Sequence, residues 1–268
     1  MDQNRIPVSD LLSIKGKTAI VTGGAVGIGF GIVQRLAEAG AKVIIADVDL
    51  ERAKKSAEDL KSRGFIAEGV VCDVSSEEDV KKMVADTISN FGSVDILVNN
   101  AGIYPSIPLS KMTLADFEKV LSVNLKGAFL CTKYATDQMI KQGRGGKVIN
   151  ITSIDALHPS MIGLAHYDSS KHGLWGFTKN AALEYSQHKI WVNAIAPGGI
   201  ITPGATGMQS GEVNEEQKKI VEAFLNKIPM HRMGEADEIG KVALFLASDM
   251  SSYMTGSQII VDGGVLLS

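Results

Sequence analysis

The chain has 268 residues, 45% of them hydrophobic, and a formal net charge of −3 with a pI near 6.0. This length and composition allow a large buried core, and no break in composition divides the chain, so we expect one domain over residues 1–268. A chain without excess positive charge lacks the electrostatic footprint of a nucleic-acid-binding protein and has no basic patch for an anionic membrane. We therefore expect neither as a partner.

The beginning of the chain, residues 1–15, is interpreted as an N-terminal extension of the domain. It lacks the long apolar core of a signal peptide, and no apolar run in the sequence approaches the roughly 18 residues of a membrane-spanning helix. These features predict a cytoplasmic protein that acts on a small molecule.

Short runs rich in Val and Ile alternate with helical segments along the chain. The first run, 17–22, is followed by the segment 30–40, whose apolar residues Ile32, Val33 and Leu36 fall on one helical face. The other runs have few polar interruptions, as expected for strands buried on both faces: 41–47, 64–74, 94–100, 146–152, 189–197 and 256–264. This alternation predicts a doubly wound Rossmann-type α/β fold, with a seven-stranded parallel sheet and helices on both faces.

A glycine-rich turn, residues 22–29, lies between the first predicted strand and the first predicted helix, which is the context that gives a glycine motif meaning. Gly23 can make the turn, the missing side chain of Gly27 lets a pyrophosphate approach backbone N–H groups, and Gly29 permits close helix packing. Because the chain contains 28 glycines, the spacing alone is weak evidence for a nucleotide site.

A carboxylate at the end of the second predicted strand supports the nucleotide interpretation. Asp47 lies 18 residues after Gly29, close to the roughly 20 expected for an acidic residue that binds a ribose. It can accept hydrogen bonds from the ribose hydroxyls of NAD and would repel the 2′-phosphate of NADP, so we expect NAD as the cofactor. The alternative is that Asp47 only starts a turn after the strand.

Two Tyr–Lys pairs show the four-residue spacing that lets an ammonium group lower the pKa of a phenol one helical turn away. Tyr167 and Lys171 follow the predicted strand 146–152, at the carboxyl ends of the strands, where ligands bind in such sheets. Tyr185 and Lys189 directly precede the next strand and so fall at the opposite edge. We expect Tyr167 to be the general acid/base and Tyr185 to lie on a helix surface.

Together these motifs resemble those of the short-chain dehydrogenase/reductase family, over nearly the whole chain. The turn at 22–29 matches the family's TGxxxGIG motif, and residues 99–102 match its NNAG motif. The resemblance implies four catalytic residues: Asn124, Ser153, Tyr167 and Lys171. In the family the serine binds the substrate oxygen, the tyrosine transfers the proton, the lysine holds the nicotinamide ribose, and the asparagine holds a water that links the lysine to solvent.

The resemblance also implies further cofactor contacts. The family's PG segment after the sixth strand corresponds to Pro197 and Gly198, and Thr202 is expected to reach the nicotinamide carboxamide. The expected cofactor-binding residues are Gly23, Gly27, Ile28, Gly29, Asp47, Asp73, Val74, Asn100, Gly102, Tyr167, Lys171, Pro197, Gly198, Ile200 and Thr202. For Asp73 and Val74 the alternative is a helix N-terminus capped by a serine and Glu78. Family members commonly form tetramers, so we expect a homotetramer.

The substrate is expected to contact variable loops, including residues 199–231, whose beginning is rich in Gly, Pro and Thr. Asp155, His158 and His166 lie near the catalytic serine and tyrosine and could bind a substrate hydroxyl, although simple loop positions are an equal alternative for the histidines. None of the five histidines has a metal-ligand spacing, so we expect no metal.

These features predict NAD-dependent oxidation or reduction of a small to medium secondary alcohol or ketone, such as a sugar, polyol or alicyclic alcohol. Three alternatives remain: a 3-oxoacyl-thioester reductase, a hydroxysteroid dehydrogenase, and a non-catalytic nucleotide-binding regulator.

Overall fold

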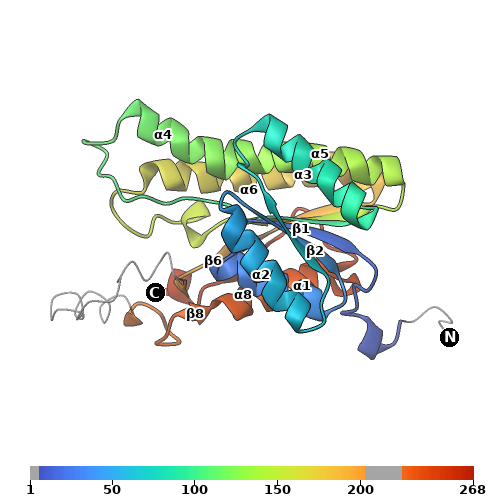
Figure 1. The fold of residues 1–268 in the computed structure, drawn as a ribbon. Helices are drawn as coiled ribbons and strands as arrows, with labels where there is room; N and C mark the ends of the chain where they lie inside the picture. Colours follow the sequence, from blue (N-terminus) through green and yellow to red (C-terminus); the bar gives the residue numbers. More distant parts are fainter. Residues whose placement is uncertain (1–5, 203–224) are drawn as a thin grey trace.

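The computed structural model describes residues 6–202 and 225–268. Within them a seven-stranded parallel sheet runs through the middle of the molecule, with helices on both sides (Figure 1). In chain order its strands are β1 Thr18–Thr22, β2 Lys42–Asp47, β3 Ala67–Val71, β4 Ile96–Asn99, β5 Gly146–Ile151, β6 Ile190–Pro197 and β9 Gln258–Val261. The spatial order is β3-β2-β1-β4-β5-β6-β9. The predicted fold class is therefore confirmed.

The order of the strands reverses between β1 and β4, which are neighbours in the sheet although β2 and β3 separate them in the chain. In open α/β sheets the crevice for a ligand lies at such a reversal, beyond the carboxyl ends of the strands. The glycine-rich turn directly follows β1, and the turn at residues 100–102 follows β4, so both candidate nucleotide segments flank this position.

Successive strand residues bury their side chains in two separate cores because side chains alternate across a sheet. Ile20 belongs to the core under α3, α5 and α6, whereas its neighbour Val21 belongs to the core under α1, α2 and α8. Both residues are fully buried. Strands covered on both faces need apolar residues at consecutive positions, and this explains the Val- and Ile-rich runs of the sequence.

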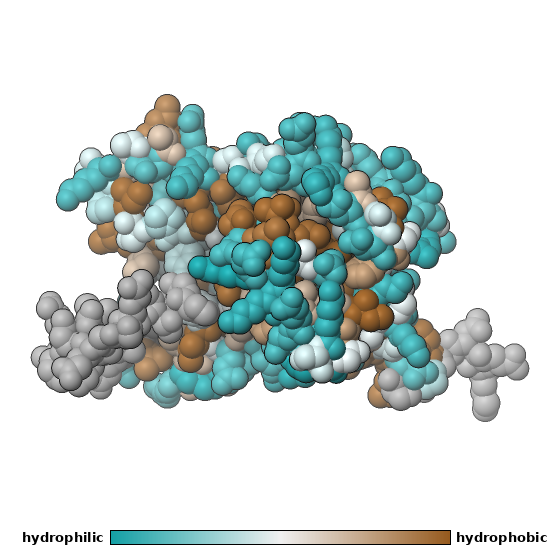
Figure 2. All heavy atoms as spheres, in the orientation of Figure 1, coloured by the Kyte–Doolittle hydropathy of each residue, from teal (hydrophilic) through white to brown (hydrophobic). Residues whose placement is uncertain are grey.

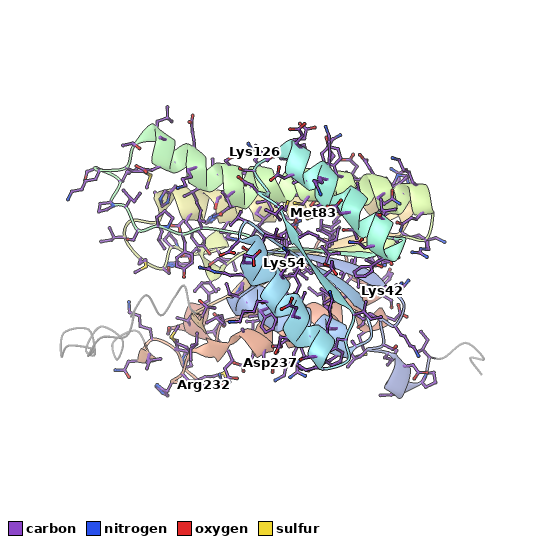
Figure 3. The ribbon with its side chains drawn as sticks, in the orientation of Figure 1. Lys42, Lys54, Met83, Lys126, Arg232 and Asp237 are labelled. Atoms are coloured by element: carbon purple, nitrogen blue, oxygen red, sulfur yellow. The ribbon has the colours of Figure 1, made fainter. Side chains whose placement is uncertain are left out.

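The helices form two layers, with α3 to α6 on one face of the sheet and α1, α2 and α8 on the other (Figure 1). Their bounds are α1 Gly27–Glu38, α2 Leu50–Ser62, α3 Glu77–Phe91, α4 Leu114–Leu121, α5 Gly127–Gln142, α6 Ala165–Tyr185 and α8 Ala236–Ala247. Met83 of α3 is fully buried, whereas Lys54 of α2 is exposed (Figure 3). Figure 2 shows hydrophilic residues over α2 and apolar residues in the band between α2 and the helical layer above it.

Shorter elements complete the described chain. A π-helical turn, η2 Ser122–Lys126, joins α4 to α5, and the strand β7 Ile200–Ile201 pairs in parallel with β8 Gly234–Glu235. The 3-10 turns are η1 Val8–Asp10, η3 Ile154–Ala156, η4 Ser186–His188, η5 Asp249–Ser251 and η6 Val265–Leu267. Most of the predicted substrate segment 199–231 lies outside the described residues. Among the helices of 6–202 and 225–268, none is long and apolar enough to cross a membrane.

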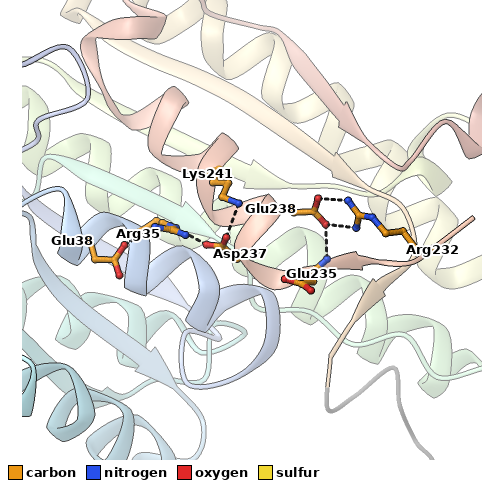
Figure 4. A network of polar contacts seen from close by, with 7 residues as sticks. All are labelled: Arg35, Glu38, Arg232, Glu235, Asp237, Glu238 and Lys241. Carbon is orange, nitrogen blue, oxygen red and sulfur yellow. Dashed lines mark hydrogen bonds and ion pairs between the residues drawn. The ribbon is translucent and has the colours of Figure 1, made fainter. Parts of the chain in front are cut away.

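Helices α1 and α8 cross with their backbones in direct contact. A Cβ atom on Gly31 would lie 2.6 Å from the carbonyl oxygen of Ala236, and one on Gly240 would lie 2.5 Å from that of Gly31. Ion pairs flank the crossing, where Asp237 binds Arg35 and Lys241 (Figure 4). These hydrogen bonds, first from Arg35 and then from Lys241, lower the pKa of Asp237 to about 2. Half-exposed pairs contribute little to stability, so the glycine contact decides how closely the helices approach.

Candidate active site

The structure brings the four predicted catalytic residues together from three elements at the carboxyl edge of the sheet. Asn124 lies in the turn η2, Ser153 follows β5, and Tyr167 and Lys171 occupy successive turns of α6. Asn124, Ser153 and Lys171 are buried, with exposed fractions of 1%, 6% and 4%. The Nζ atom of Lys171 lies 5.6 Å from the centre of the Tyr167 ring. The four-residue spacing therefore places the amine beside the phenol, as the sequence predicted.

Ser153 is positioned by the end of β5 and by the short turn η3. Its hydroxyl is the cap of that turn, because Ser153 Oγ accepts the N–H of Asp155 at 3.1 Å. The same hydroxyl donates to Asp155 Oδ2 at 2.8 Å. A hydrogen bond with Ser153 also lowers the pKa of Tyr167, so the serine lies next to both the phenol and the carboxylate of Asp155.

The expected lowering of the Tyr167 pKa by Lys171 is not found in this structure. Although Tyr167 as a whole is half-buried, desolvation of its hydroxyl raises the pKa above its ordinary value. The hydrogen bond from Ser153 opposes this shift, and the charges of Asp155 and Asp168 add to it. The Tyr–Lys spacing indicates the ammonium group but not the burial of the phenol or the presence of these two carboxylates.

Lys171 is itself desolvated. Burial lowers its pKa to about 8, and the charge of Asp155 opposes this shift. Its Nζ atom donates to the backbone carbonyl of Ile151, the last residue of β5, at 2.7 Å. An amine with a pKa near 8 is only partly charged in mildly alkaline solution, which weakens its influence on the phenol.

Asn124 is held by the turn that follows β4. Its Oδ1 accepts the N–H of Ile103 at 2.8 Å, and its Nδ2 donates to the carbonyl of Ile103 at 2.9 Å and to Ser170 Oγ at 3.1 Å. The π-helical geometry of η2 at this residue was not predicted from the sequence. Single π-turns inside helical segments often mark functional positions.

The second Tyr–Lys pair lies at the far end of the same helix. Tyr185 is the last residue of α6, 18 positions after Tyr167 and roughly 27 Å from it along the helix axis. It is half-buried against the core under α3, α5 and α6, so the expectation of a plain surface position was wrong. Lys189 is exposed immediately before β6. This pair is therefore remote from the carboxyl ends of the strands.

The glycine-rich turn has a backbone geometry that suits a nucleotide-binding turn. Gly23 and Gly27 adopt φ angles of 59° and 57°, which a residue with a side chain rarely adopts. A Cβ atom on Gly29 would lie 2.1 Å from the carbonyl oxygen of Gly23, so Gly29 lets the helix pack against the turn itself. Asn100 braces the turn by donating to the carbonyls of Thr22 and Gly23, both at 2.9 Å.

Asp47 is fixed beside this turn. Its carboxylate accepts the N–H of Ala25 at 3.3 Å and the N–H of Asp49 at 3.2 Å, which leaves lone pairs on both oxygens for other donors. A bare glycine turn at a helix N-terminus and a fixed carboxylate next to it suit the pyrophosphate and the ribose of a dinucleotide. The residues present therefore fit a nicotinamide dinucleotide.

Three more predicted cofactor residues lie at the same edge of the sheet, and they differ in exposure and in their contacts. Asp73 is exposed and accepts the N–H and the hydroxyl of Ser75, and the cap of α3 is Ser76 with Asp79 in place of the expected Glu78. Val74 is buried at 5% exposure. A Cβ atom on Gly102 would lie 3.3 Å from Asn124 Oδ1 and 3.7 Å from Lys171 Nζ.

Four further predicted positions follow the sixth strand. Pro197 ends β6, and Gly198 lies so close to Asp262 that a Cβ atom would come within 2.8 Å of its backbone. Ile200 is buried in β7. Thr202 is the last described residue before the gap.

The three predicted substrate residues lie in different environments. Asp155 is buried beside Ser153 at 6% exposure, and its Oδ1 accepts the N–H of Ser160 at 2.8 Å. His158 is exposed after η3, with Nδ1 near the carbonyl oxygen of Pro159. His166 is fully buried, and its Nδ1 accepts the N–H of Tyr167 at 2.8 Å. In the part of the chain that the structure describes, no cluster of His, Cys, Asp and Glu could hold a metal ion.

Comparisons with known proteins identify the family of the chain. The family model described as Enoyl-(Acyl carrier protein) reductase matches residues 23–266. A 3-oxoacyl-[acyl-carrier-protein] reductase of Aquifex aeolicus is 40% identical over 255 residues, which cover 95% of this chain and 99% of the relative. The chain belongs to the short-chain dehydrogenase/reductase family.

Solved structures of short-chain dehydrogenase/reductases share the fold over almost their whole length. One from Mycobacterium marinum aligns with a TM-score of 0.91 at 33% identity and covers 98% of this chain and 100% of its own. One from Beutenbergia cavernae, proposed to be an NAD(P)-dependent gluconate 5-dehydrogenase and holding NADP, aligns with a TM-score of 0.88 at 32% identity over 96% of this chain and 100% of its own. The chain is thus an oxidoreductase of a family whose members use NAD or NADP.

Proposed function

We propose that this short-chain dehydrogenase/reductase transfers a hydride between NAD and the carbon of a small to medium secondary alcohol or ketone. The observation that carries the proposal is the arrangement of Ser153, Tyr167 and Lys171 at the switch point of the sheet, next to the glycine turn. A phenol, a hydroxyl and an amine at one site can bind an oxygen and exchange a proton with it. The presence of both Tyr167 and Lys171 argues against a non-catalytic nucleotide-binding regulator.

The chain's own residues handle the proton and the substrate oxygen. Tyr167 Oη gives its proton to the carbonyl oxygen during reduction and takes it back during oxidation. Ser153 Oγ hydrogen-bonds that oxygen as charge develops on it. Lys171 would hold the ribose of a bound dinucleotide, and Asn124 fixes the backbone of Ile103 and so the turn after β4. When bound, the dinucleotide supplies or accepts the hydride.

A second candidate is the reduction of a 3-oxoacyl thioester, which the Aquifex aeolicus relative's name favours. The mouth of the site also favours an apolar substrate over a sugar. Tyr104, whose ring centre lies 6.0 Å from that of Tyr167, is 48% exposed, and Leu157, Met161 and Ile162 are 43%, 61% and 88% exposed. The N–H of Ile107 donates to the carbonyl of Gly163 at 2.9 Å and so ties the two loops that bear these residues.

A substrate panel tests the proposal. NADH and NADPH absorbance is followed with alicyclic ketones, keto sugars, a 3-oxosteroid and a 3-oxoacyl thioester. The apolar mouth predicts a higher kcat/KM for an alicyclic ketone or a thioester than for a keto sugar of similar size. Absence of turnover with every ketone and both cofactors would remove the dehydrogenase proposal.

The choice of cofactor depends on Asp47. We expect the wild-type enzyme to prefer NADH over NADPH, because the fixed carboxylate accepts ribose hydroxyls and repels a 2′-phosphate. Asp47→Ala should move the ratio of the two kcat/KM values toward NADPH by about 100-fold, which corresponds to the removal of one charge repulsion and two hydrogen bonds. Asp49→Ala, which removes the neighbouring carboxylate that caps α2, is the control and should leave the ratio nearly unchanged. A wild-type preference for NADPH would contradict the assignment.

The assembly and the location of the protein are part of the same proposal. We propose a homotetramer in the cytoplasm, on the basis of the family resemblance. The edge strand β9 carries Ile260, which is 46% exposed, and apolar edge residues of this kind are commonly covered by a second subunit. Light scattering at micromolar concentration measures the assembly, and a monomer would contradict it.

A further inference from the structure

A buried carboxylate, that of Asp155, lies directly beside Ser153 in the candidate active site. Asp155 is 6% exposed, and both of its oxygens have close donors. Oδ2 accepts the hydroxyl of Ser153 at 2.8 Å, and Oδ1 accepts the N–H of Ser160 at 2.8 Å. The N–H of Asp155 returns a hydrogen bond to Ser153 Oγ at 3.1 Å, so the two residues bind each other twice.

This arrangement constrains what the serine can donate. A hydroxyl carries one proton, and hydrogen bonds to an ionised acceptor are about twice as strong as those between neutral groups. The Ser153 proton is therefore held by Asp155 as long as the Tyr167 oxygen is a neutral phenol. Only a developing negative charge, on the phenol or on a substrate oxygen, competes with the carboxylate for the serine proton.

We propose that Asp155 is a positioning residue: its carboxylate holds the hydroxyl proton of Ser153 until a charged oxygen, on the phenol or on the substrate, draws that proton away. This inference rests on the proposed function. It differs from a direct substrate contact, because Asp155 acts through Ser153. It also explains why a carboxylate is tolerated in a buried site, since a hydroxyl and a backbone N–H satisfy its oxygens.

Several charged and polar groups besides Asp155 surround the phenol of Tyr167. Along α6 these are His166, Asp168, Lys171 and His172, the loop after β4 contributes Tyr104, and the loop after β5 contributes Ser153. Asp155 and Asp168 both raise the pKa of Tyr167 by their charge. Of these two carboxylates, Asp155 is the one hydrogen-bonded to Ser153. Asp168 is therefore a matched control that separates the effect of charge from the effect of the hydrogen bond.

The test compares Asp155→Asn and Asp168→Asn in the wild-type and the Ser153→Ala backgrounds. On the plateau of the pH profile, Asp155→Asn should lower kcat about tenfold, a fraction of the 10²–10³-fold loss for removing a whole transition-state donor, with little change in KM. In the Ser153→Ala background the same substitution should cost no further kcat, because the residue through which it acts is gone. Both Asn variants should move the rise of alcohol oxidation to lower pH, by about one unit, since each removes a like charge near the phenol.

Two kinetic outcomes would overturn the inference. One is an equal loss of kcat with and without Ser153, which would show that Asp155 acts independently. The other is a raised KM confined to hydroxylated substrates, which would show that Asp155 binds the substrate directly.

A measurement without substrate separates this inference from the proposed function. The thermal unfolding midpoints of the wild type, Ser153→Ala, Asp155→Asn and the double variant form a cycle. The double variant should lose less than the sum of the single losses, because the singles break the same hydrogen bond. Additive losses would overturn the positioning role even in an active enzyme. A non-additive cycle in a protein that turns over no ketone would leave the Ser153–Asp155 coupling in place and refute only the proposed function.

Discussion

Tyr167→Phe should lower kcat by about 10²- to 10⁴-fold, the usual effect of removing a general acid/base. The substitution takes away one oxygen, and the ring that contacts Tyr104 remains. The hydroxyl is the partner of Ser153 and the group that exchanges the proton in the proposed reaction. Binding of NADH, measured by the fluorescence of the reduced nicotinamide, should be unchanged within about a factor of three, because the loss falls on the transition state.

The chain provides a matched control for this variant. Tyr185→Phe removes a phenol with the same Tyr–Lys spacing at the other end of α6, roughly 27 Å away along the helix axis. It should keep turnover near that of the wild type. A Tyr167→Phe enzyme with near-normal kcat, or a large loss of kcat in Tyr185→Phe alone, would show that Tyr167 is not the general acid/base.

Lys171→Met should lower kcat/KM by about 10²- to 10³-fold, since it removes the amine that we propose to hold the ribose and that supplies positive charge beside the phenol. The matched control is Lys189→Met, an exposed lysine at the opposite edge of the sheet. Near-normal activity of Lys171→Met would remove the lysine from the catalytic group.

The same variant should change how stability depends on pH. Burial lowers the pKa of Lys171 to about 8 from its ordinary value of 10.5. Between these two values the unfolded chain still binds a proton that the folded protein has released, so the free energy of unfolding rises with pH. From pH 8 to pH 10 this contribution amounts to about 2 kcal/mol. In Lys171→Met it should be absent.

Two other buried groups also make stability depend on pH. The effect of Lys171 is therefore measured as the difference between the free energies of unfolding of the wild type and Lys171→Met. Burial raises the pKa values of the thiols Cys72 and Cys131, and this effect lowers stability over the same pH range in both proteins. Urea unfolding of wild type, Lys171→Met and Lys189→Met at pH 8, 9 and 10 provides the comparison. If the free energies of unfolding of the wild type and Lys171→Met change in parallel with pH, the amine of Lys171 is not desolvated as described.

The strands and the nucleotide turn could be predicted from the sequence because their residues are determined locally. A strand covered on both faces needs consecutive apolar residues, as at Ile20 and Val21, and a turn with positive φ angles needs glycines such as Gly23 and Gly27. The position of Tyr167 at the carboxyl edge also followed from strand order alone. These features depend on residues close to one another in the chain.

The electrostatics of the site could not be predicted in the same way. The pKa of Tyr167 depends on its burial and on Asp155, which lies 12 residues away in sequence and reaches the phenol only because η3 and α6 pack together. The spacing of Tyr167 and Lys171 suggested a lowered value, and the opposite was found. The π-turn at Asn124 was missed for a related reason, since its geometry is stabilised by contacts with Ile103 and Ser170 from other elements.

The close crossing of α1 and α8 has a consequence for the order in which the protein matures during synthesis. The nucleotide turn lies at the beginning of α1, within the first tenth or so of the chain, while the helix that packs backbone to backbone against it is more than 190 residues further on. A growing polypeptide therefore carries α1 without the helix that packs against its backbone until nearly all of the chain has left the ribosome.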